Sequence, residues 1–257
     1  MQTPETARLF GLDVAMVDHE AAVAQILDWA RSRPAHIVVT PNLDHVVKLR
    51  HEPDFRAAYE DADLIVADGM PFVWLSRLEG TPLPARVAGS ELIEPVCRAA
   101  AQAGLSIFFL GSTEARLVAA ETALKARVPG LKVAGHLAPP FGFRDDSAAQ
   151  AEAADAVAAS GADIVFLALS APTQEIYATR YRNRFDCGVV LCIGAGLDFL
   201  SGDVARAPAW MQRGGLEWVW RTLQEPRRLA PRYGRIIWLL PQLMAAHRAD
   251  QRARRSG

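Results

Sequence analysis

Polar residues that can contact a ligand stand where apolar, strand-like runs of this sequence end. Asp68 and Gly69 follow the run 64–67, so a carboxylate is paired with a residue that lets the chain turn and a ligand approach closely. Thr40 and Asn42 end an earlier run and offer a hydroxyl and an amide. Both ends also have a structural alternative, because Asn and Asp are favoured caps of a helix that follows.

Three further run ends carry residues suited to phosphate or to polar ligands. The turn at Gly111 can present backbone N–H groups and the positive end of the next helix to a phosphate, although many α/β turns share this composition. Another run is followed by Gln174 and Glu175. The last run leads to the sequence Gly-Ala-Gly-Leu-Asp, which ends at Asp198 and is not a GxGxxG pattern, because position 199 is Phe. A nicotinamide-cofactor fingerprint is therefore missing.

Several signatures of metal or nucleophile chemistry are also missing. Asp61 and Asp63 have the DxD spacing of metal-dependent sugar transferases, but they precede their strand, and this placement favours a solvated turn. The six histidines have no metal-ligand spacing, and the three cysteines form no CxxC pair. The sequence contains no P-loop and no G-x-S-x-G nucleophile elbow.

The polar run ends require a scaffold that brings them together. Apolar, β-rich runs alternate with Ala-rich segments that favour helix, and the runs are continuous, as in strands buried on both faces. The alternation predicts an α/β protein with a Rossmann-like, doubly wound, mostly parallel sheet, whose ligand lies beyond the carboxyl ends of the strands. Residues 8–17 are expected to add a short strand or hairpin at the edge. The expected strands are 36–40, 64–68, 106–111, 132–135, 164–169 and 189–193, and the clearest helices are 91–103, 114–127 and 147–160.

Charge is divided unevenly along the 257 residues. The net charge is −1, from 28 Lys and Arg against 29 Asp and Glu, but residues 206–257 hold eleven arginines and three acids and so carry about +8. This distribution argues against a uniformly basic nucleic-acid binder. The change in charge near residue 206 divides the chain into the predicted Rossmann-like domain at 1–205 and a cationic, helical appendage at 206–257. The prolines at 226, 231 and 241 are expected to divide that appendage into short pieces.

No targeting or anchoring segment is visible in the sequence. The first residues lack the basic start and apolar core of a signal peptide, so a cytoplasmic location is expected. The longest apolar run of the appendage, 236–240, is far shorter than the roughly 20 residues of a spanning helix. The mixture of Arg and Trp in the appendage leaves two interpretations, a solvated helical surface or a surface that lies on an anionic membrane.

An ordered set of motifs resembles the WecG/TagA/CpsF family of bacterial glycosyltransferases (glycosyltransferase family 26), from about residue 8 to 235. Each motif alone is common, but their order along the chain is specific. The first motifs are Thr40-Pro41-Asn42, Ala67-Asp68-Gly69, 82–89, 109–111 and 171–175, and the most specific ones follow at 206–212, 215–218 and 221–228.

The resemblance implies an inverting transferase that moves a sugar from a UDP-sugar to a sugar linked to a polyprenyl diphosphate. It implies N-acetylmannosamine, its uronate or glucose as the donor sugar, with no tightly bound metal and no cofactor. It also implies a peripheral position on the anionic inner face of the cell membrane, in the synthesis of teichoic acid or another surface polysaccharide. The oligomeric state stays open, with a homo-oligomer as one candidate.

The resemblance also assigns roles to residues. It makes Asp68 the catalytic base that takes the proton of the acceptor hydroxyl. Arg86, the Gly111 turn and arginines of the appendage are expected to stabilise the diphosphate, and the other members of the substrate-binding set to orient the sugars. That set is Thr40, Asn42, Arg86, Gly111, Gln174, Glu175, Asp198, Arg206, Arg221, Arg227 and Arg228. The arginines beyond the motifs, which are Arg248, Arg252, Arg254 and Arg255, are expected to serve membrane attraction.

The sequence departs from the family pattern close to the expected ligand. Thr173 stands where Lys is usual, Pro71 replaces the second Gly of an Asp-Gly-x-Gly motif, and Leu197 replaces the Phe of a Phe-Asp pair. These differences bear on the donor sugar more than on the fold. Two other classes stay as alternatives, a nucleotide-dependent oxidoreductase or epimerase, against which the missing GxGxxG counts, and a non-catalytic, membrane-associated assembly partner.

Overall fold

A six-stranded parallel sheet forms the centre of the protein in the computed structural model, which describes residues 4–200, 207–208, 210–211 and 216–255. The strand order is β4-β3-β8-β7-β5-β6, and every pairing is parallel. The predicted Rossmann-like α/β class is therefore confirmed. The strands are β3 (His36–Val39), β4 (Leu64–Ile65), β5 (Ser106–Gly111), β6 (Lys132–Leu137), β7 (Ile164–Ala168) and β8 (Val189–Cys192).

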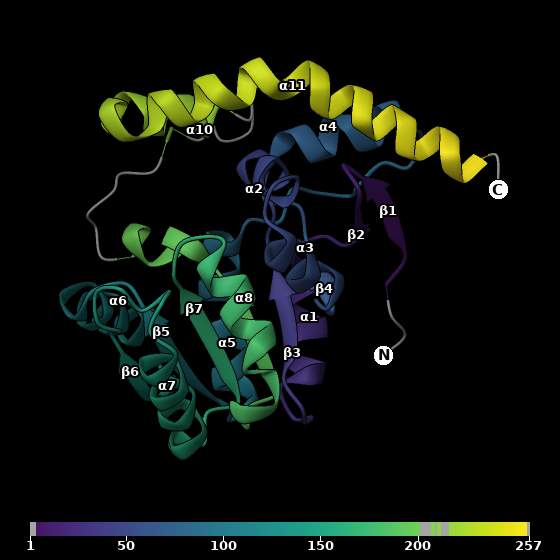
Figure 1. Ribbon diagram of the computed structural model, residues 1–257. Coiled ribbons are helices and arrows are strands. Elements are labelled where there is room, and N and C mark those ends of the chain that lie inside the picture. Colours follow the sequence, from purple (N-terminus) through teal and green to yellow (C-terminus); the bar gives the residue numbers. More distant parts are fainter. Residues whose placement is uncertain (1–3, 201–206, 209, 212–215, 256–257) are drawn as a thin grey trace.

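Helices cover both faces of the sheet because its central strands are apolar on both sides. Every residue of β7 and β8 is buried. Along β8, Val190 packs into one hydrophobic cluster, whereas Val189 and Leu191 pack into the other. One face is covered by α2 (Leu43–Leu49), α3 (Pro53–Glu60), α7 (Ser147–Ser160) and α8 (Thr173–Arg180), and the other by α1 (His19–Trp29), α5 (Gly89–Ala103) and α6 (Glu114–Arg127) (Figure 1).

Two neighbouring strands send the chain to opposite faces of the sheet. After β3 the chain enters α2 on one face, whereas after β8 it enters the 3-10 turn η2 (Gly194–Phe199), whose Leu197 packs into the cluster of the other face. Ligands of open α/β sheets bind where such neighbours diverge, beyond their carboxyl ends. A second short 3-10 turn, η1 (Arg182–Arg184), lies between α8 and β8.

A small hairpin stands beside the central sheet. Its strands are β1 (Thr6–Leu9) and β2 (Leu12–Ala15), and the turn residues Phe10 and Gly11 both have positive φ, as in tight hairpin turns that match the strand twist. The predicted hairpin is confirmed, but it is a two-stranded sheet of its own and not an added strand of the large sheet. It packs on α4 (Met70–Leu78), where the ring of Phe72 lies 5.2 Å from the ring of Phe10.

The described part of the chain ends in α10 (Glu217–Gln224) and the long helix α11 (Pro226–Arg255), which crosses the top of the molecule in Figure 1. The C-terminal helical segment is confirmed, but the prediction that its prolines divide α11 is wrong. Pro226 begins the helix, where a missing N–H costs nothing, and Pro231 and Pro241 lie on its exposed side. The opposite side is buried against the body and holds the helix together despite the lost hydrogen bonds. That buried stripe consists of Leu229, Ile236, Leu243 and His247.

Within the described residues, every helix is too short or too polar to cross a membrane.

Candidate active site at the strand ends

Backbone hydrogen bonds bring Asp68 and Arg86 together at the carboxyl end of β4. The Asp68 N–H donates to the carbonyl of Pro41 (3.0 Å), which fastens the loop after β4 to the loop after β3. The Val87 N–H donates to the carbonyl of Ala67 (2.8 Å) and so fixes the segment before α5 beside the same loop. As a result, Arg86 Nη1 lies 3.7 Å from Asp68 Oδ1.

Arg86 is surrounded by three carboxylates. Its Nη2 donates to Glu91 Oε1 in the first turn of α5, and its Nη1 lies 3.8 Å from Glu217 Oε2 at the start of α10 as well as near Asp68. The second oxygen of Glu91 lies 3.1 Å from His19 Nε2. The Arg86 side chain is only 17% exposed, so this cluster fixes the direction in which its guanidinium points.

The surroundings of Asp68 suit it to accept a proton near neutral pH. Burial raises the pKa of Asp68 from 3.8 to about 7, Arg86 and Arg221 oppose that rise, and Glu91 and Glu217 add to it. About 28% of the side chain is still exposed, so a substrate hydroxyl can reach the carboxylate. A base whose pKa lies close to the working pH combines the correct protonation state with useful basicity.

Thr40 and Asn42 have structural partners beside this site. The Thr40 hydroxyl is buried and donates to the carbonyl of Cys192 (3.1 Å), which joins the end of β3 to the end of β8. The Asn42 side chain accepts a hydrogen bond from the Asp44 N–H (3.0 Å) and caps α2, as its structural alternative predicted. Direct contact of either residue with a sugar stays a prediction.

Gln174 and Glu175 form a buried pair that reaches β8. Gln174 Nε2 donates to Glu175 Oε1 (2.8 Å), and Gln174 Oε1 accepts from the Gly194 N–H (3.0 Å). Both side chains are almost completely buried, and Glu175 Oε2 has no hydrogen-bond partner among the described residues. Burial raises the pKa of Glu175 to about 7, against the opposing effect of the Gln174 hydrogen bond. The pair therefore holds the start of the loop after β8 in place through the hydrogen bond to Gly194.

Gly111 and Asp198 have contacts away from the Asp68 and Arg86 pair. Gly111 has a φ of +122°, and a Cβ atom there would lie 2.5 Å from the backbone of Ala168, so the position requires glycine. The Ser112 N–H donates to the Ala168 carbonyl (2.9 Å), which engages one of the amides predicted to face a phosphate. Asp198 in η2 lies 3.3 Å from Arg116 on α6.

The appendage contributes residues to the site through α10 and α11. Arg221 on α10 lies over the ring of Phe199, with its guanidinium carbon 5.4 Å from the ring centre, and its charge lowers the pKa of Asp68. Tyr233 on α11 packs against Trp218 on α10, with ring centres 5.3 Å apart. Among the other predicted arginines, Arg206 lies outside the described residues, and Arg227 and Arg228 fall in the first turn of α11, where Arg227 is exposed.

Two acids of the Arg86 cluster, Glu91 and Glu217, are absent from the set that the sequence predicted. Both lie within or next to motifs of the resemblance, at 82–89 and 215–218. Their proximity to Arg86 depends on how α5 and α10 pack in the folded protein, so the contacts could not be predicted from the sequence. The DxD pair, by contrast, has structural partners, since Asp63 accepts from the Ile37 N–H (2.7 Å) and pairs with Arg182 (3.0 Å).

No group of three or more His, Cys, Asp or Glu side chains that could hold a metal ion occurs in the described part of the chain. The absence of a tightly bound metal stays a prediction.

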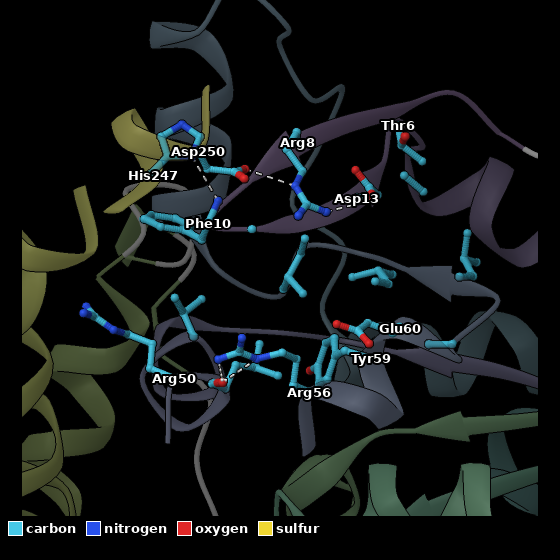
Figure 2. Close-up of a pocket in the computed structure, with 18 of the residues that line it drawn as sticks. Thr6, Arg8, Phe10, Asp13, Arg50, Arg56, Tyr59, Glu60, His247 and Asp250 are labelled. Atoms are coloured by element: carbon cyan, nitrogen blue, oxygen red, sulfur yellow. Dashed lines mark hydrogen bonds and ion pairs between the residues drawn. The ribbon is translucent and has the colours of Figure 1, made fainter. Parts of the chain in front are cut away.

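A cavity of about 530 Å³ lies apart from this site, between the hairpin, α3 and the end of α11. Figure 2 shows how its walls are tied: Arg8 pairs with Asp13 (2.9 Å) and Asp250 (3.2 Å), and the Phe10 N–H donates to His247 Nδ1 (3.3 Å). None of the predicted substrate-binding residues lines this cavity. Its contacts attach the far end of α11 to the hairpin.

Comparison with known proteins gives consistent matches. Residues 7–254 match the glycosyl transferase WecG/TagA/CpsF family. The chain is 37% identical over 193 residues to an N-acetylglucosaminyldiphosphoundecaprenol N-acetyl-beta-D-mannosaminyltransferase of Bacillus spizizenii (strain W23), a match that covers 74% of this chain and 72% of the relative. It is 29% identical over 192 residues to a protein of the same name from Bacillus subtilis (strain 168), covering 75% and 73%. The chain that folds around Asp68 and Arg86 therefore belongs to the glycosyl transferase WecG/TagA/CpsF family.

Proposed function

We propose that the protein transfers a sugar from a UDP-sugar to a sugar linked to a polyprenyl diphosphate, with inversion at the anomeric carbon and with Asp68 as the base. The observation that carries this proposal is the pairing of Asp68 with Arg86 at the carboxyl end of β4, next to α10. It places a proton acceptor and a cation side by side, as transfer from a diphosphate donor requires.

The reaction is a single displacement. The acceptor hydroxyl oxygen attacks the anomeric carbon, its proton passes to a carboxylate oxygen of Asp68, and the bond between that carbon and the β-phosphate oxygen breaks, so that UDP leaves. Attack from the face opposite the leaving group inverts the configuration. A pKa of about 7 lets Asp68 be ionised in the resting enzyme and still take up the proton.

Cations near the base are suited to the charge that develops on the departing diphosphate. Arg86 lies 3.7 Å from Asp68, and Arg221 is close enough for its charge to affect the same carboxyl group. Guanidinium groups bind phosphate oxygens through two parallel hydrogen bonds. In the proposed complex, one or both arginines hold the diphosphate, while the Gln174 pair keeps the loop after β8 in place.

The names of the relatives support a choice of donor and acceptor. Both relatives are named as enzymes that transfer N-acetyl-beta-D-mannosamine to N-acetylglucosaminyldiphosphoundecaprenol. UDP-N-acetylmannosamine is therefore the first donor to test, with the uronate and glucose as the next candidates. The substitutions Thr173 and Pro71, near the strand ends, are the sequence differences that bear on this choice.

The exposed side of α11 supports a position on the membrane surface that carries such an acceptor. Trp238 is 72% exposed and Ile237 57%, and exposed arginines, Arg235 and Arg248, lie on the same helix. Large apolar side chains beside cations are typical of helices that lie at an anionic bilayer surface. We propose that this side of α11 contacts the inner face of the cell membrane.

The decisive experiment is a transfer assay with the full chain. UDP-N-acetylmannosamine, UDP-glucose and the uronate donor are each offered with a synthetic polyprenyl-diphosphate N-acetylglucosamine acceptor, and the glycolipid product is identified by mass spectrometry and its anomeric configuration by NMR. A β-linked product that depends on both substrates supports the proposal. Failure of every UDP-sugar to transfer, in a protein that is folded, would refute it.

A further inference from the structure

Glu217 is the member of the Arg86 cluster that the appendage supplies. Its Oε2 lies 3.8 Å from Arg86 Nη1, and the same nitrogen lies 3.7 Å from Asp68 Oδ1. Both distances exceed that of a direct hydrogen bond, so the guanidinium stands between the two carboxylates without closing on either. Glu217 is 23% exposed and begins α10, so its carboxylate reaches this position only when α10 lies on the body of the protein.

We propose that Glu217 is a positioning residue of this site, which holds Arg86 jointly with Asp68 and Glu91, so that α10 completes the charge balance around the base when it docks. The consequence for catalysis rests on the proposed function, whereas the contact itself does not.

The physical effect has two parts. Glu217 is a third acid beside the Arg86 guanidinium, and a guanidinium shared among more acids neutralises each of them less, so Asp68 keeps more of its basicity. The carboxylate of Glu217 also repels the charge of Asp68 directly, which favours uptake of a proton. Both parts act in the same direction and disappear when Glu217 loses its charge.

Other ionisable groups face Asp68 and set the background for this effect. Arg86 approaches from the segment before α5, Glu91 from α5, and Arg221 from α10. The charge of Asp68 also acts on Tyr59 of α3 and Tyr233 of α11. The pKa of each phenol is raised mainly by burial, and Asp68 adds to that rise. Because only Glu217 is changed in the test below, these groups serve as a constant background.

A purely structural role for Glu217 makes a different prediction. An acid in the first turn of a helix stabilises it through the helix dipole, so its removal would loosen α10 and reduce the burial of Asp68. Tryptic cleavage between the body and α11 reports such loosening. A shift of the Asp68 titration at an unchanged cleavage rate supports the electrostatic role, whereas a shift accompanied by faster cleavage would show a structural role and overturn the inference.

The test compares the full-length protein with Glu217→Gln and Glu217→Asp. Aspartate carboxyl carbons are labelled with ¹³C, the Asp68 signal is identified by its loss in Asp68→Asn, and its titration is followed from pH 5 to 9. Asp155→Asn is the control, because Asp155 forms an exposed ion pair with Arg184 outside the site. Thermal unfolding verifies that each variant is folded.

We expect the Asp68 titration midpoint to fall by about half a pH unit or more in Glu217→Gln, a roughly threefold change in its ionised fraction on the acid side, and to return toward the wild-type value in Glu217→Asp. The acid limb of the kcat profile should move with it. An unchanged Asp68 titration in a folded Glu217→Gln protein would overturn the inference. So would a lower KM for the donor with an unchanged acid limb, because Glu217 would then only compete with the diphosphate for Arg86. The NMR titration needs no substrate, so an inactive wild-type protein would count against the proposed function alone.

Discussion

The guanidinium of Arg232 on α11 lies 3.1 Å from the carboxylate of Asp44 on α2. Asp44 also donates its backbone N–H to the side chain of Asn42, and its carboxylate lies 2.9 Å from Lys48. Helix α11 is thus attached to the first turn of α2, the helix that follows β3, close to the proposed site. How firmly the appendage docks depends in part on this pair.

Loss of the Arg232–Asp44 pair should slow transfer while changing the stability of the protein only a little. Arg232→Ala removes one partly exposed ion pair, so we expect a loss of about 1 kcal/mol or less in the free energy of unfolding. We also expect faster tryptic cleavage between the body and α11, and slower transfer, because α10 packs on α11 through Trp218 and Tyr233. Arg98→Ala is the matched control, since Arg98 pairs with Glu94 on the exposed side of α5. Equal proteolysis and equal transfer rates in both variants would show that the pair has no part in docking.

The Asp68→Asn substitution should abolish transfer while leaving donor binding intact. Asn has the same shape but cannot accept the proton, and loss of a general base typically lowers kcat by a factor of about 10² to 10⁴. Stabilisation of the variant by UDP in a thermal-shift measurement should persist. In the wild-type protein, kcat/KM should fall below about pH 7, because protonated Asp68 cannot act as a base. Near wild-type turnover in Asp68→Asn would remove it from that role.

Buried Glu175 should make the protein less stable as the pH rises. Its pKa is about 7 in the folded state and near 4.5 when unfolded, so the folded state binds more protons between these values. Stability should therefore decrease from about pH 4.5 to 7, by an amount on the order of 3 kcal/mol when the shift is converted at 1.36 kcal/mol per unit. Glu175→Gln keeps the acceptor for Gln174 but cannot ionise. Urea unfolding at several pH values gives the free energy of unfolding of each protein. That of the wild type should fall relative to that of Glu175→Gln as the pH rises. A difference that does not change with pH would contradict the burial argument.

Gly111→Ala should be far more damaging than the replacement of a glycine that has open space around it. The new Cβ would lie 2.5 Å from the backbone carbonyl of Ala168, between two paired strands that cannot separate locally. Gly142→Ala is the control, since Gly142 also has positive φ but no atom within 4 Å of the added carbon. We expect about 1 kcal/mol of strain in the control and a loss of several kcal/mol at Gly111, measured by urea unfolding. Similar losses at both positions would mean that φ alone matters.

Membrane contact through α11 predicts a dependence on both apolar and charged residues. Trp238→Ala and Arg235→Ala should each weaken binding to liposomes with anionic lipid by roughly fivefold, because a basic residue near such a surface contributes about 1 kcal/mol and a large aromatic side chain at least as much. Binding should fall as salt is added. Arg98→Ala again serves as the control, and cosedimentation is the measurement. If Trp238→Ala and Arg235→Ala both bind liposomes like the wild type, the exposed side of α11 is not the contact.

The sheet was predictable from the sequence because its signal is local. Runs such as 164–168 are apolar without interruption, as expected for a strand buried on both faces, and their shortness favours strand over buried helix. The cap formed by Asn42 could be predicted for the same reason, since a cap involves residues two positions apart. The prolines of α11 led to a wrong prediction, because the stripe of buried residues that holds this helix on the body is a tertiary feature.

The site was only partly predictable for a related reason. Asp68 and Arg86 could be selected as residues, but their 3.7 Å approach depends on the hydrogen bond between Val87 and Ala67. Glu217 reaches the same guanidinium from a position 131 residues further along the chain. Contacts of this kind follow from packing, which no short pattern in the sequence contains.

Helix α11 connects the hairpin with the Asp68 site. Its first turns stand beside the Asp68 site, and its last turns are held to the hairpin by the pairing of Arg8 with Asp250 and by the hydrogen bond from Gln251 to the Arg8 carbonyl. A helix of this length is about 45 Å long, so one continuous element connects these two regions. Loss of the Arg8 contacts is therefore expected to loosen the same helix whose first turns stand beside the Asp68 site.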